Sequence, residues 1–443
     1  MIRRLRRASV FAAVSAVAVL APALGDAAAV PFLAVAGLAF FGVRDGEWFE
    51  TLALPGDREE ERLYGFVAFA VAAGGLALFA SLPRAPLPHE AFAAAALAVG
   101  VGRLGRTVAA GRTDDEFTLV ASYVGAGTAG AAAGQVGVRL QTEGSGLVGG
   151  LPEVAFLAAV AALAAALVRS LVFDRDAHIT MILVAFAVWG FIWLDPAVTV
   201  PLVAFGLAVS GGLGYVSFAL GTASVPGMLT GVLSALLAVV LGGLGWFATL
   251  ISFYAIGGLA SKYRFDEKAS RGVAQENEGA RGTGNVLANS AVALAALVGY
   301  AGTAHVDVPG ALFALAFAGA TATAMADTLS SEIGGLYDGP RLITTLRRVE
   351  PGTDGAVTWQ GELAGIAGAA LVAALAGLWM PIGGAVLGGA LVVLAGLAGM
   401  TVDSLLGALI EGDRVGNQAV NFLATLSGAA VAVVAAVALG VGV

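Results

Sequence analysis

The feature of this sequence that most limits its fold is a series of long apolar runs. Stretches such as 152–173, 362–379 and 421–442 are almost free of charged residues. About 20 mostly apolar residues let one helix cross a hydrocarbon layer of roughly 30 Å. The whole chain is 58% hydrophobic and 12% charged, and its runs lack the polar–apolar alternation of a membrane β-barrel. We therefore predict an all-α, polytopic membrane bundle in contact with the lipid bilayer.

Candidate spans can be placed along the entire chain, and we expect about 13 to 15 transmembrane helices. Arginine and lysine are retained on the cytoplasmic side of short loops. With a cytoplasmic N-terminus, only Arg84 and Arg139 fall outside. The basic N-terminal segment also resembles the start of a signal peptide. The spans that follow instead favour an N-terminus retained in the cytoplasm and a multi-pass protein of the cell membrane. The candidates are 8–24, 28–43, 64–83, 90–105, 117–138, 152–173, 178–194, 198–215, 227–243, 244–260, 286–303, 309–326, 362–379, 382–401 and 421–442.

Composition argues against several kinds of site. The chain has no cysteine and three histidines, so a thiolate metal site is impossible and a histidine-rich site is not expected. The net charge of −8 argues against a nucleic acid as a partner. The 63 glycines lie throughout the spans, where small residues allow helices to pack closely.

The polar residues divide the chain into two regions. Residues 1–197 form an N-terminal multi-helix membrane region whose loops carry no recognisable chemistry. Residues 198–443 hold three polar loops, at 261–285, 327–361 and 402–420. Two spans separate each successive pair of loops, so all three must emerge on one side, which the charge distribution predicts to be cytoplasmic.

The loop 327–361 begins with an ionisable group at membrane depth. Asp327 follows a long apolar run, and a carboxylate so placed usually faces a cavity or a partner. If the helix continues, Asp327 and Ser331 share a face, whereas Glu332 lies about 140° away around the axis. Such oxygens suit Mg²⁺, which takes one or two carboxylates and leaves other positions to water and phosphate. The alternative is an ordinary helix end entering water.

The rest of this loop carries hydroxyls, paired arginines and closely spaced glycines. Gly352 and Gly355 can turn successive N–H groups toward one anion. Arg347 or Arg348 can grip phosphate oxygens in bidentate fashion. The Gly-Lys-Ser/Thr ending of a Walker loop is missing. These residues predict phosphate binding, although the arginines can also serve only to set orientation.

The other two loops add amides and a second acid next to a span. Most charges of 261–285 fit a solvated loop, but Asn289 enters the following span, where a buried amide needs partners and can mark a cavity wall. Asp403 follows an apolar span, and Asn417 and Asn421 share a helical face. Together the loops can supply the charge neutralisation and alignment that phosphoryl transfer needs.

Several motifs occur in one order along residues 198–442. They are Arg281–Asn289 in the loop that begins at Lys262, the Ala-Asp-Thr-x-Ser-Ser-Glu-Ile-Gly sequence at Ala326–Gly334, the Gly-Thr-x-Gly loop within Ile343–Gly361, and Asp403-Ser404 with Asn417 and Asn421. This set resembles the membrane family of transmembrane protein 19 and the phytyl-phosphate kinases. The resemblance implies phosphoryl transfer from a nucleoside triphosphate, often CTP, to a prenyl monophosphate of the geranylgeranyl or phytyl type.

The resemblance also implies roles for individual residues. Asp327 and Glu332 would hold Mg²⁺ or orient the acceptor, and with Ser331 and Asp403 they would form the catalytic group. The groups implied in binding the nucleotide or the lipid phosphate come from all three loops: Lys262, Lys268, Arg281, Asn285, Asn289, Thr344, Arg347, Arg348, Gly352, Thr353, Gly355, Asn417 and Asn421.

Two other functions fit the same residues. An ion- or proton-coupled transporter would use Asp327 and Asp403 as its ion sites. Residues 1–197 offer no counterpart of the acidic motif, as a transporter built from related halves would. The other alternative is a noncatalytic membrane scaffold. The kinase is favoured because a prenyl tail can remain in the bilayer while its phosphate reaches the loops.

Overall fold

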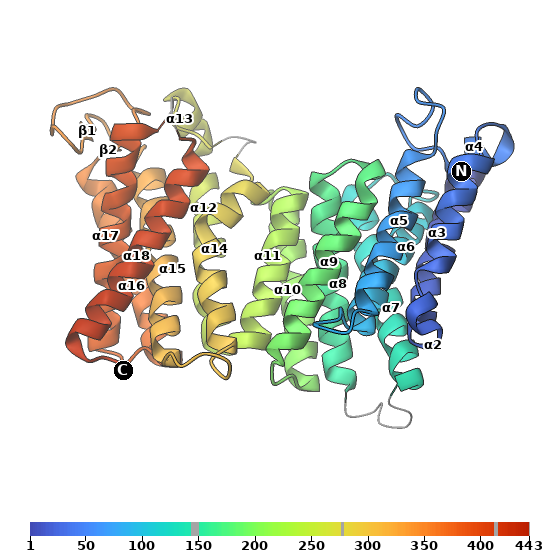
Figure 1. Ribbon diagram of the computed structural model, residues 1–443. Coiled ribbons are helices and arrows are strands. Elements are labelled where there is room, and N and C mark those ends of the chain that lie inside the picture. Colours follow the sequence, from blue (N-terminus) through green and yellow to red (C-terminus); the bar gives the residue numbers. More distant parts are fainter. Residues whose placement is uncertain (143–149, 276–278, 412–414, 443) are drawn as a thin grey trace. The chain divides into compact units, whose positions relative to one another are not determined.

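The computed structural model describes residues 1–142, 150–275, 279–411 and 415–442, and these are overwhelmingly helical (Figure 1). Twelve of the described helices are long and apolar enough to cross a membrane, fewer than the roughly 13 to 15 expected from the sequence. Shorter apolar helices cover Val30–Gly42 and Tyr64–Ala80. Every span predicted from the sequence falls on a helix, so the predicted fold class of a polytopic helical membrane protein is confirmed.

The chain divides into two compact units, Met1–Ala204 and Phe205–Val443. The boundary falls near the start of α10 (Val200–Ala219). The roles and the cytoplasmic placement expected for 1–197 and 198–443 stay predictions. The first unit contains α1 (Ile2–Ala16), η1 (Val17–Leu20), α2 (Ala21–Leu24), η2 (Gly25–Ala27), α3 (Val30–Gly37), η3 (Leu38–Gly42), α4 (Gly46–Leu52), α5 (Tyr64–Ala80), α6 (His89–Ala109), α7 (Glu116–Thr142), α8 (Leu151–Leu171), η5 (Asp174–Asp176) and α9 (Ala177–Leu194).

The second unit continues from α10 through a helical bundle with one short β-pair. Its strands β1 (Arg341–Leu342) and β2 (Ala356–Val357) pair antiparallel, with Arg341 opposite Val357. The helices are α11 (Val225–Leu237), η6 (Ala238–Gly242), α12 (Leu244–Lys262), α13 (Phe265–Ser270), α14 (Thr283–Ala301), α15 (Gly310–Gly334), α16 (Trp359–Trp379), α17 (Leu387–Ile410) and α18 (Asn417–Leu439).

Helix α6 is the centre of the first unit, where it packs against α1, α7, α8 and α9. A buried ion-pair network joins three of these helices, because Arg139 of α7 lies 2.9 Å from Glu90 of α6 and 2.8 Å from Glu153 of α8. Arg139 is one of the two arginines assigned to the outer side. Its charge is balanced locally by two carboxylates, which reduces the cost of placing it there.

Helix α15 is the centre of the second unit and packs against α12, α14, α16, α17 and α18. Almost every residue from Ala314 to Ala326 is buried. Glycines allow the close approach: a β-carbon on Gly428 of α18 would overlap the Thr323 hydroxyl and lie 3.0 Å from the Ala395 carbonyl oxygen. Small residues therefore hold α15, α17 and α18 together, as expected for helices packing in lipid.

Adding one methyl group at this crossing is expected to destabilise the second unit. We expect Gly428→Ala to lower the free energy of unfolding by about 1 to 3 kcal/mol, because the packed backbones must separate. Thermal unfolding in detergent measures the change. Gly211→Ala on α10 is the matched control, since its β-carbon would meet no atom within 4 Å. Equal melting temperatures for the two variants would contradict the packing argument.

Candidate functional site

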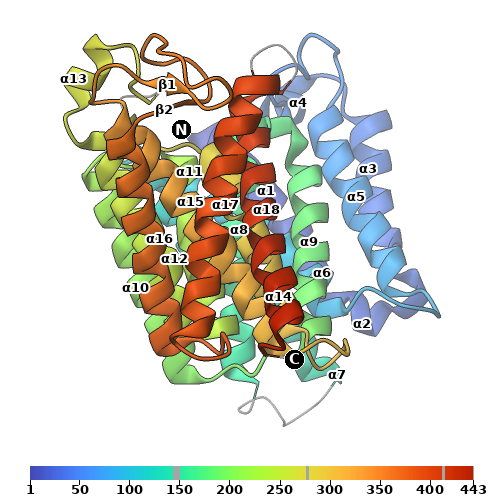
Figure 2. The same ribbon diagram turned by 90° about the vertical axis from the view of Figure 1, so that its left-hand side faces the viewer.

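The three polar loops predicted from the sequence meet at one end of the second unit (Figure 2). Arg271, in the first loop, donates from Nη1 to the Leu336 carbonyl oxygen of the second at 3.0 Å. A β-carbon on Gly355 would lie 2.5 Å from the Ser404 carbonyl oxygen of α17. The second loop therefore lies against both the first loop and the end of α17. Residues 276–278 and 412–414, within the first and third loops, lie outside the described residues.

The acidic motif lies on a continuous helix, because α15 extends to Gly334. Five residues of helix rotate a side chain by about 140°, so Asp327 and Glu332 point to different neighbours. Asp327 meets Asp403 of α17, whereas Glu332 meets Lys268 of α13. The two acids predicted to share one metal ion thus belong to two separate pairs.

The first pair consists of two carboxyl groups. Asp327 and Asp403 lie within hydrogen-bond reach of each other, and both residues are half-buried. The Asp403 Oδ1 atom is buried and has no hydrogen-bond partner among the described residues. Two carboxyl groups at this separation repel each other when both are ionised, and a shared proton or a bound cation removes that repulsion. The pair is therefore suited to hold either one.

The described residues contain no group of three or more histidine, aspartate or glutamate side chains that could hold a metal ion. A divalent cation at Asp327 and Asp403 would consequently take its remaining ligands from water and a bound phosphate. That arrangement fits Mg²⁺, which commonly binds one or two carboxylates together with substrate phosphates.

The second pair is a buried ion pair. Lys268 Nζ lies 2.5 Å from Glu332 Oε2 and donates to the carbonyl oxygens of Ala260 and Ser261, each at 2.9 Å. Both side chains are at most 2% exposed. Lys268 thus caps the end of α12 and attaches α13 to α15. The Lys268 charge is thus neutralised by Glu332 within the protein. The role of Lys268 in binding phosphate and the role of Glu332 in binding metal stay predictions.

Arg281 interacts electrostatically with one acid of each pair, Glu332 and Asp327. It is buried, its Nη2 lies 3.3 Å from the Thr328 hydroxyl, and its guanidinium sits 5.3 Å from the centre of the Phe253 ring. Burial lowers the pKa of Arg281, and the charges of Glu332 and Asp327 oppose that shift. A β-carbon on Gly257 would lie 2.8 Å from Nη1, so this glycine of α12 provides the space for the guanidinium.

A cavity of about 70 Å³ lies on the other side of Arg281, between α10, α11, α12 and α14. Most of its lining is apolar, with Leu213, Val232 and Ile251 among the contributors. Ser210 and Arg281 also line it, and Ser210 Oγ and Arg281 Nε have no hydrogen-bond partner among the described residues. Arg281 therefore both lines a mainly apolar cavity and interacts electrostatically with Asp327.

The glycine-containing loop has the backbone that its sequence predicted. Gly352 and Gly355 have φ angles of +84° and +73°, a region that residues with side chains rarely adopt. The Thr353 hydroxyl donates to the Glu350 carbonyl oxygen at 2.7 Å. Thr344, Arg347 and Arg348 are exposed side chains of the same loop. The structure brings the loop to α17 beside Asp403 and leaves both arginines facing outward.

The predicted amides gather at the beginnings of α14 and α18. Asn289 donates to the Asn285 carbonyl oxygen at 3.0 Å, and Asn421 donates to Asn417 Oδ1 at 3.3 Å. Asn417 also hydrogen-bonds Glu411, whose pKa is raised by burial. Gln418 and Gly284 are in contact, so the two helix starts are neighbours.

Two more of the predicted residues lie near the ends of α12 and α15. Lys262 ends α12, with its Nζ 3.6 Å from the β-carbon position of Gly221. Ser331 is exposed, and its hydroxyl donates to the Thr328 carbonyl oxygen at 3.1 Å. Sequence reasoning missed Ser210 and Gly257, because they lie within apolar helices where nothing local marks them.

Comparison with known proteins shows to which family the chain belongs. A model of the family described as "Integral membrane protein DUF92" matches residues 208–429, half of the chain. The chain belongs to this family. The match lies within 198–442, so the resemblance to the family of transmembrane protein 19 and the phytyl-phosphate kinases is confirmed as a family relation.

Similar proteins are found in Methanocaldococcus jannaschii, Synechocystis and Arabidopsis thaliana. The uncharacterized membrane protein MJ0933 of Methanocaldococcus jannaschii is 35% identical over 43% of this chain and 76% of its own length. The uncharacterized membrane protein sll0875 of Synechocystis is 33% identical over 43% of this chain and 74% of its own. The Arabidopsis thaliana protein VTE6, chloroplastic, is 34% identical over 27% of this chain and 36% of its own length. No solved structure matches the chain.

Proposed function

We propose that this member of the DUF92 family is a prenyl-phosphate kinase of the cell membrane. It would transfer a phosphoryl group from CTP or another nucleoside triphosphate to a prenyl monophosphate of the geranylgeranyl or phytyl type. The observation that carries the proposal is the pairing of Asp327 with Asp403 where the three polar loops meet. A divalent cation bound there would neutralise phosphate charge and align the reacting groups, which is most of what phosphoryl transfer requires.

The reaction requires no covalent enzyme intermediate. A phosphate oxygen of the prenyl monophosphate attacks the γ-phosphorus of the nucleotide while the bond from γ-phosphorus to the β–γ bridging oxygen breaks. The products are a prenyl diphosphate and a nucleoside diphosphate. Arg281 would bind the phosphate of the prenyl acceptor, because a guanidinium group binds phosphate oxygens well. Its electrostatic interaction with Asp327 would keep that phosphate near the carboxyl pair.

The loop at Gly352–Gly355 is the proposed site of the nucleotide triphosphate. Its two glycines have positive φ angles, a backbone conformation found in loops that turn N–H groups toward an anion. Arg347 and Arg348 are exposed on the same loop. Its contact with Ser404 places it next to the acid pair. The prenyl acceptor would approach from the bilayer, with its phosphate at Arg281 and its first isoprene unit against the cavity between α10 and α14.

The transfer is tested with purified full-length protein in detergent. We expect γ-labelled CTP or ATP with Mg²⁺ and geranylgeranyl or phytyl monophosphate to give labelled prenyl diphosphate. Chelation with EDTA should abolish the product and excess Mg²⁺ should restore it. If no nucleotide and no prenyl monophosphate gives product in a folded preparation, the kinase proposal is wrong.

The same carboxyl pair favours one other function. Two carboxyls that share a proton are a plausible element of a proton-coupled transporter. Uptake into sealed vesicles distinguishes the two proposals. Transport driven by a proton gradient, together with absence of labelled diphosphate, would support the transporter instead of the kinase.

A further inference from the structure

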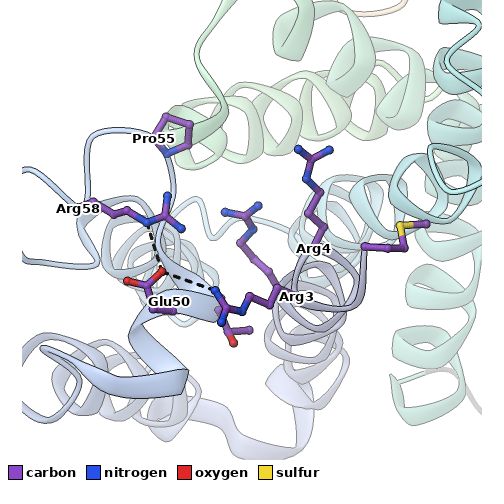
Figure 3. A pocket seen from close by; sticks show the side chains of 8 residues that line it. Arg3, Arg4, Glu50, Pro55 and Arg58 are labelled. Atoms are coloured by element: carbon purple, nitrogen blue, oxygen red, sulfur yellow. Dashed lines mark hydrogen bonds and ion pairs between the residues drawn. The ribbon is translucent and has the colours of Figure 1, made fainter.

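A pocket in the first unit gathers arginines from two segments that are far apart in the sequence (Figure 3). Its volume is about 360 Å³, and it lies between the first turns of α1, the helix α4 and the loop that follows α4. The charged side chains that line it are Arg3, Arg4, Arg7, Arg58 and Glu50. One carboxylate therefore faces four guanidinium groups.

The arginines are not balanced by the acids around them. Glu50 is shared between Arg58, at 3.4 Å, and Arg3, at 3.9 Å. Arg7 is repelled by both Arg4 and Arg58, although Asp57 and Asp174 attract it. The Arg4 side chain has no hydrogen bond or ion pair with the described residues. An anion entering the pocket would relieve this repulsion.

The wall of the pocket is held in place by buried hydrogen bonds. Asp57 is fully buried and accepts from the backbone N–H groups of Leu54, at 2.9 Å, and Gly65, at 3.2 Å. Arg7 Nη1 donates to the Ala53 carbonyl oxygen at 2.5 Å. The loop that carries Arg58 is thus anchored at both of its ends. The positive charges converge on a preformed hollow instead of extending separately into water.

We propose that this pocket binds a phosphate group, as the headgroup of an anionic lipid or as a free diphosphate. Guanidinium groups bind phosphate oxygens in a bidentate geometry, which makes arginine the preferred side chain for recognising phosphate in this way. The pocket lies at the start of the apolar span Ile2–Ala27, the depth at which lipid phosphates are found. Its volume is in the range of pockets that hold small ligands. The site is separate from the proposed kinase site, so either proposal can fail alone.

Native mass spectrometry of the full-length protein in detergent tests the site. The probes are dioleoyl phosphatidic acid and dioleoyl phosphatidylcholine, with inorganic diphosphate as a competitor. We expect phosphatidic acid to bind at least about tenfold more tightly than phosphatidylcholine, because charge-assisted hydrogen bonds add to its affinity. The double variant Arg4→Gln/Arg58→Gln should lose that preference. Arg44→Gln, an exposed arginine before α4 that does not line the pocket, should retain it.

Each outcome is decisive. Phosphatidic acid binding lost only in the double variant supports a lipid headgroup, and diphosphate binding lost in the same way supports a free phosphate. Equal binding of phosphatidic acid and diphosphate to wild type and double variant, or no binding of either to wild type, would contradict the proposal. The arginines would then serve only to set the orientation of the chain in the membrane. If the double variant unfolds at a lower temperature without ligand, the single variant Arg4→Gln replaces it, because Arg4 has no partner among the described residues to lose.

Discussion

Asp327→Asn is expected to reduce phosphoryl transfer by about 100-fold or more, because charge stabilisation by a bound metal ion contributes several kcal/mol to such reactions. The substitution keeps the size of the side chain and removes the charge of one half of the Asp327–Asp403 pair. Initial rates of labelled diphosphate formation measure the effect. The melting temperature should stay near that of wild type or rise, since two adjacent carboxyls no longer repel each other.

Asp403→Asn should reproduce this loss if the two carboxyls form one site. Asp307→Asn is the matched control, because Asp307 is an exposed carboxylate in the connection between α14 and α15. That connection lies at the other end of the helices. A kinase whose rate falls equally in the control, or is unchanged in Asp403→Asn, would not use the pair as proposed.

Lys268→Met is expected to have the largest effect on stability. Removing one member of a buried ion pair leaves the other charge without compensation, which costs about 3 to 5 kcal/mol. Here the Glu332 side chain, at 2% exposure, would lose the cation with which it forms its ion pair. The carbonyl oxygens of Ala260 and Ser261 would also lose their donor. Thermal unfolding and expression level in the membrane report the change.

Two further variants separate the ion pair from other contributions. The double variant Lys268→Met/Glu332→Leu should recover much of the lost stability, because it leaves no isolated charge. Arg264→Met removes an exposed cation that pairs with Glu267 in the same segment, and exposed pairs contribute less than about 1 kcal/mol. If Arg264→Met destabilised as strongly as Lys268→Met, burial of the pair would not be the cause.

The membrane fold could be predicted from the sequence because it depends on local quantities. Length and apolarity of each run determine whether a helix can span the bilayer, and all predicted spans fall on helices. Parity then required the three polar loops to emerge together. The angular separation of Asp327 and Glu332 followed from helical geometry alone.

The partners of these residues could not be predicted, because they come from distant segments. Helical geometry indicates that Asp327 and Glu332 face different directions, but only the packing of α15 shows that they meet Asp403 and Lys268. Lys268 belongs to a loop whose charges resemble ordinary solvated ones. Its burial depends on how α13 folds against α15. The prediction that Asp327 and Glu332 bind one metal ion was made from the sequence alone, which does not show these longer-range contacts.

The arginines of the first unit illustrate the same limit. Arg3, Arg4 and Arg7 precede an apolar run, and that position alone is explained by membrane orientation. Arg58 lies in a loop with charges of both signs. Nothing in either segment indicates that they line one pocket. Convergence of this kind is a property of the tertiary structure.

The central claim is that Asp327 and Asp403 form a single divalent-cation site, and binding of Mn²⁺ in place of Mg²⁺ tests it most directly. Electron paramagnetic resonance of the purified protein measures free and bound Mn²⁺ without any catalysed reaction. We expect one specific ion per chain, bound more tightly when a nucleoside triphosphate is added, and lost in both Asp327→Asn and Asp403→Asn. Specific binding that persists in both variants, or no specific binding with nucleotide present, would contradict the claim.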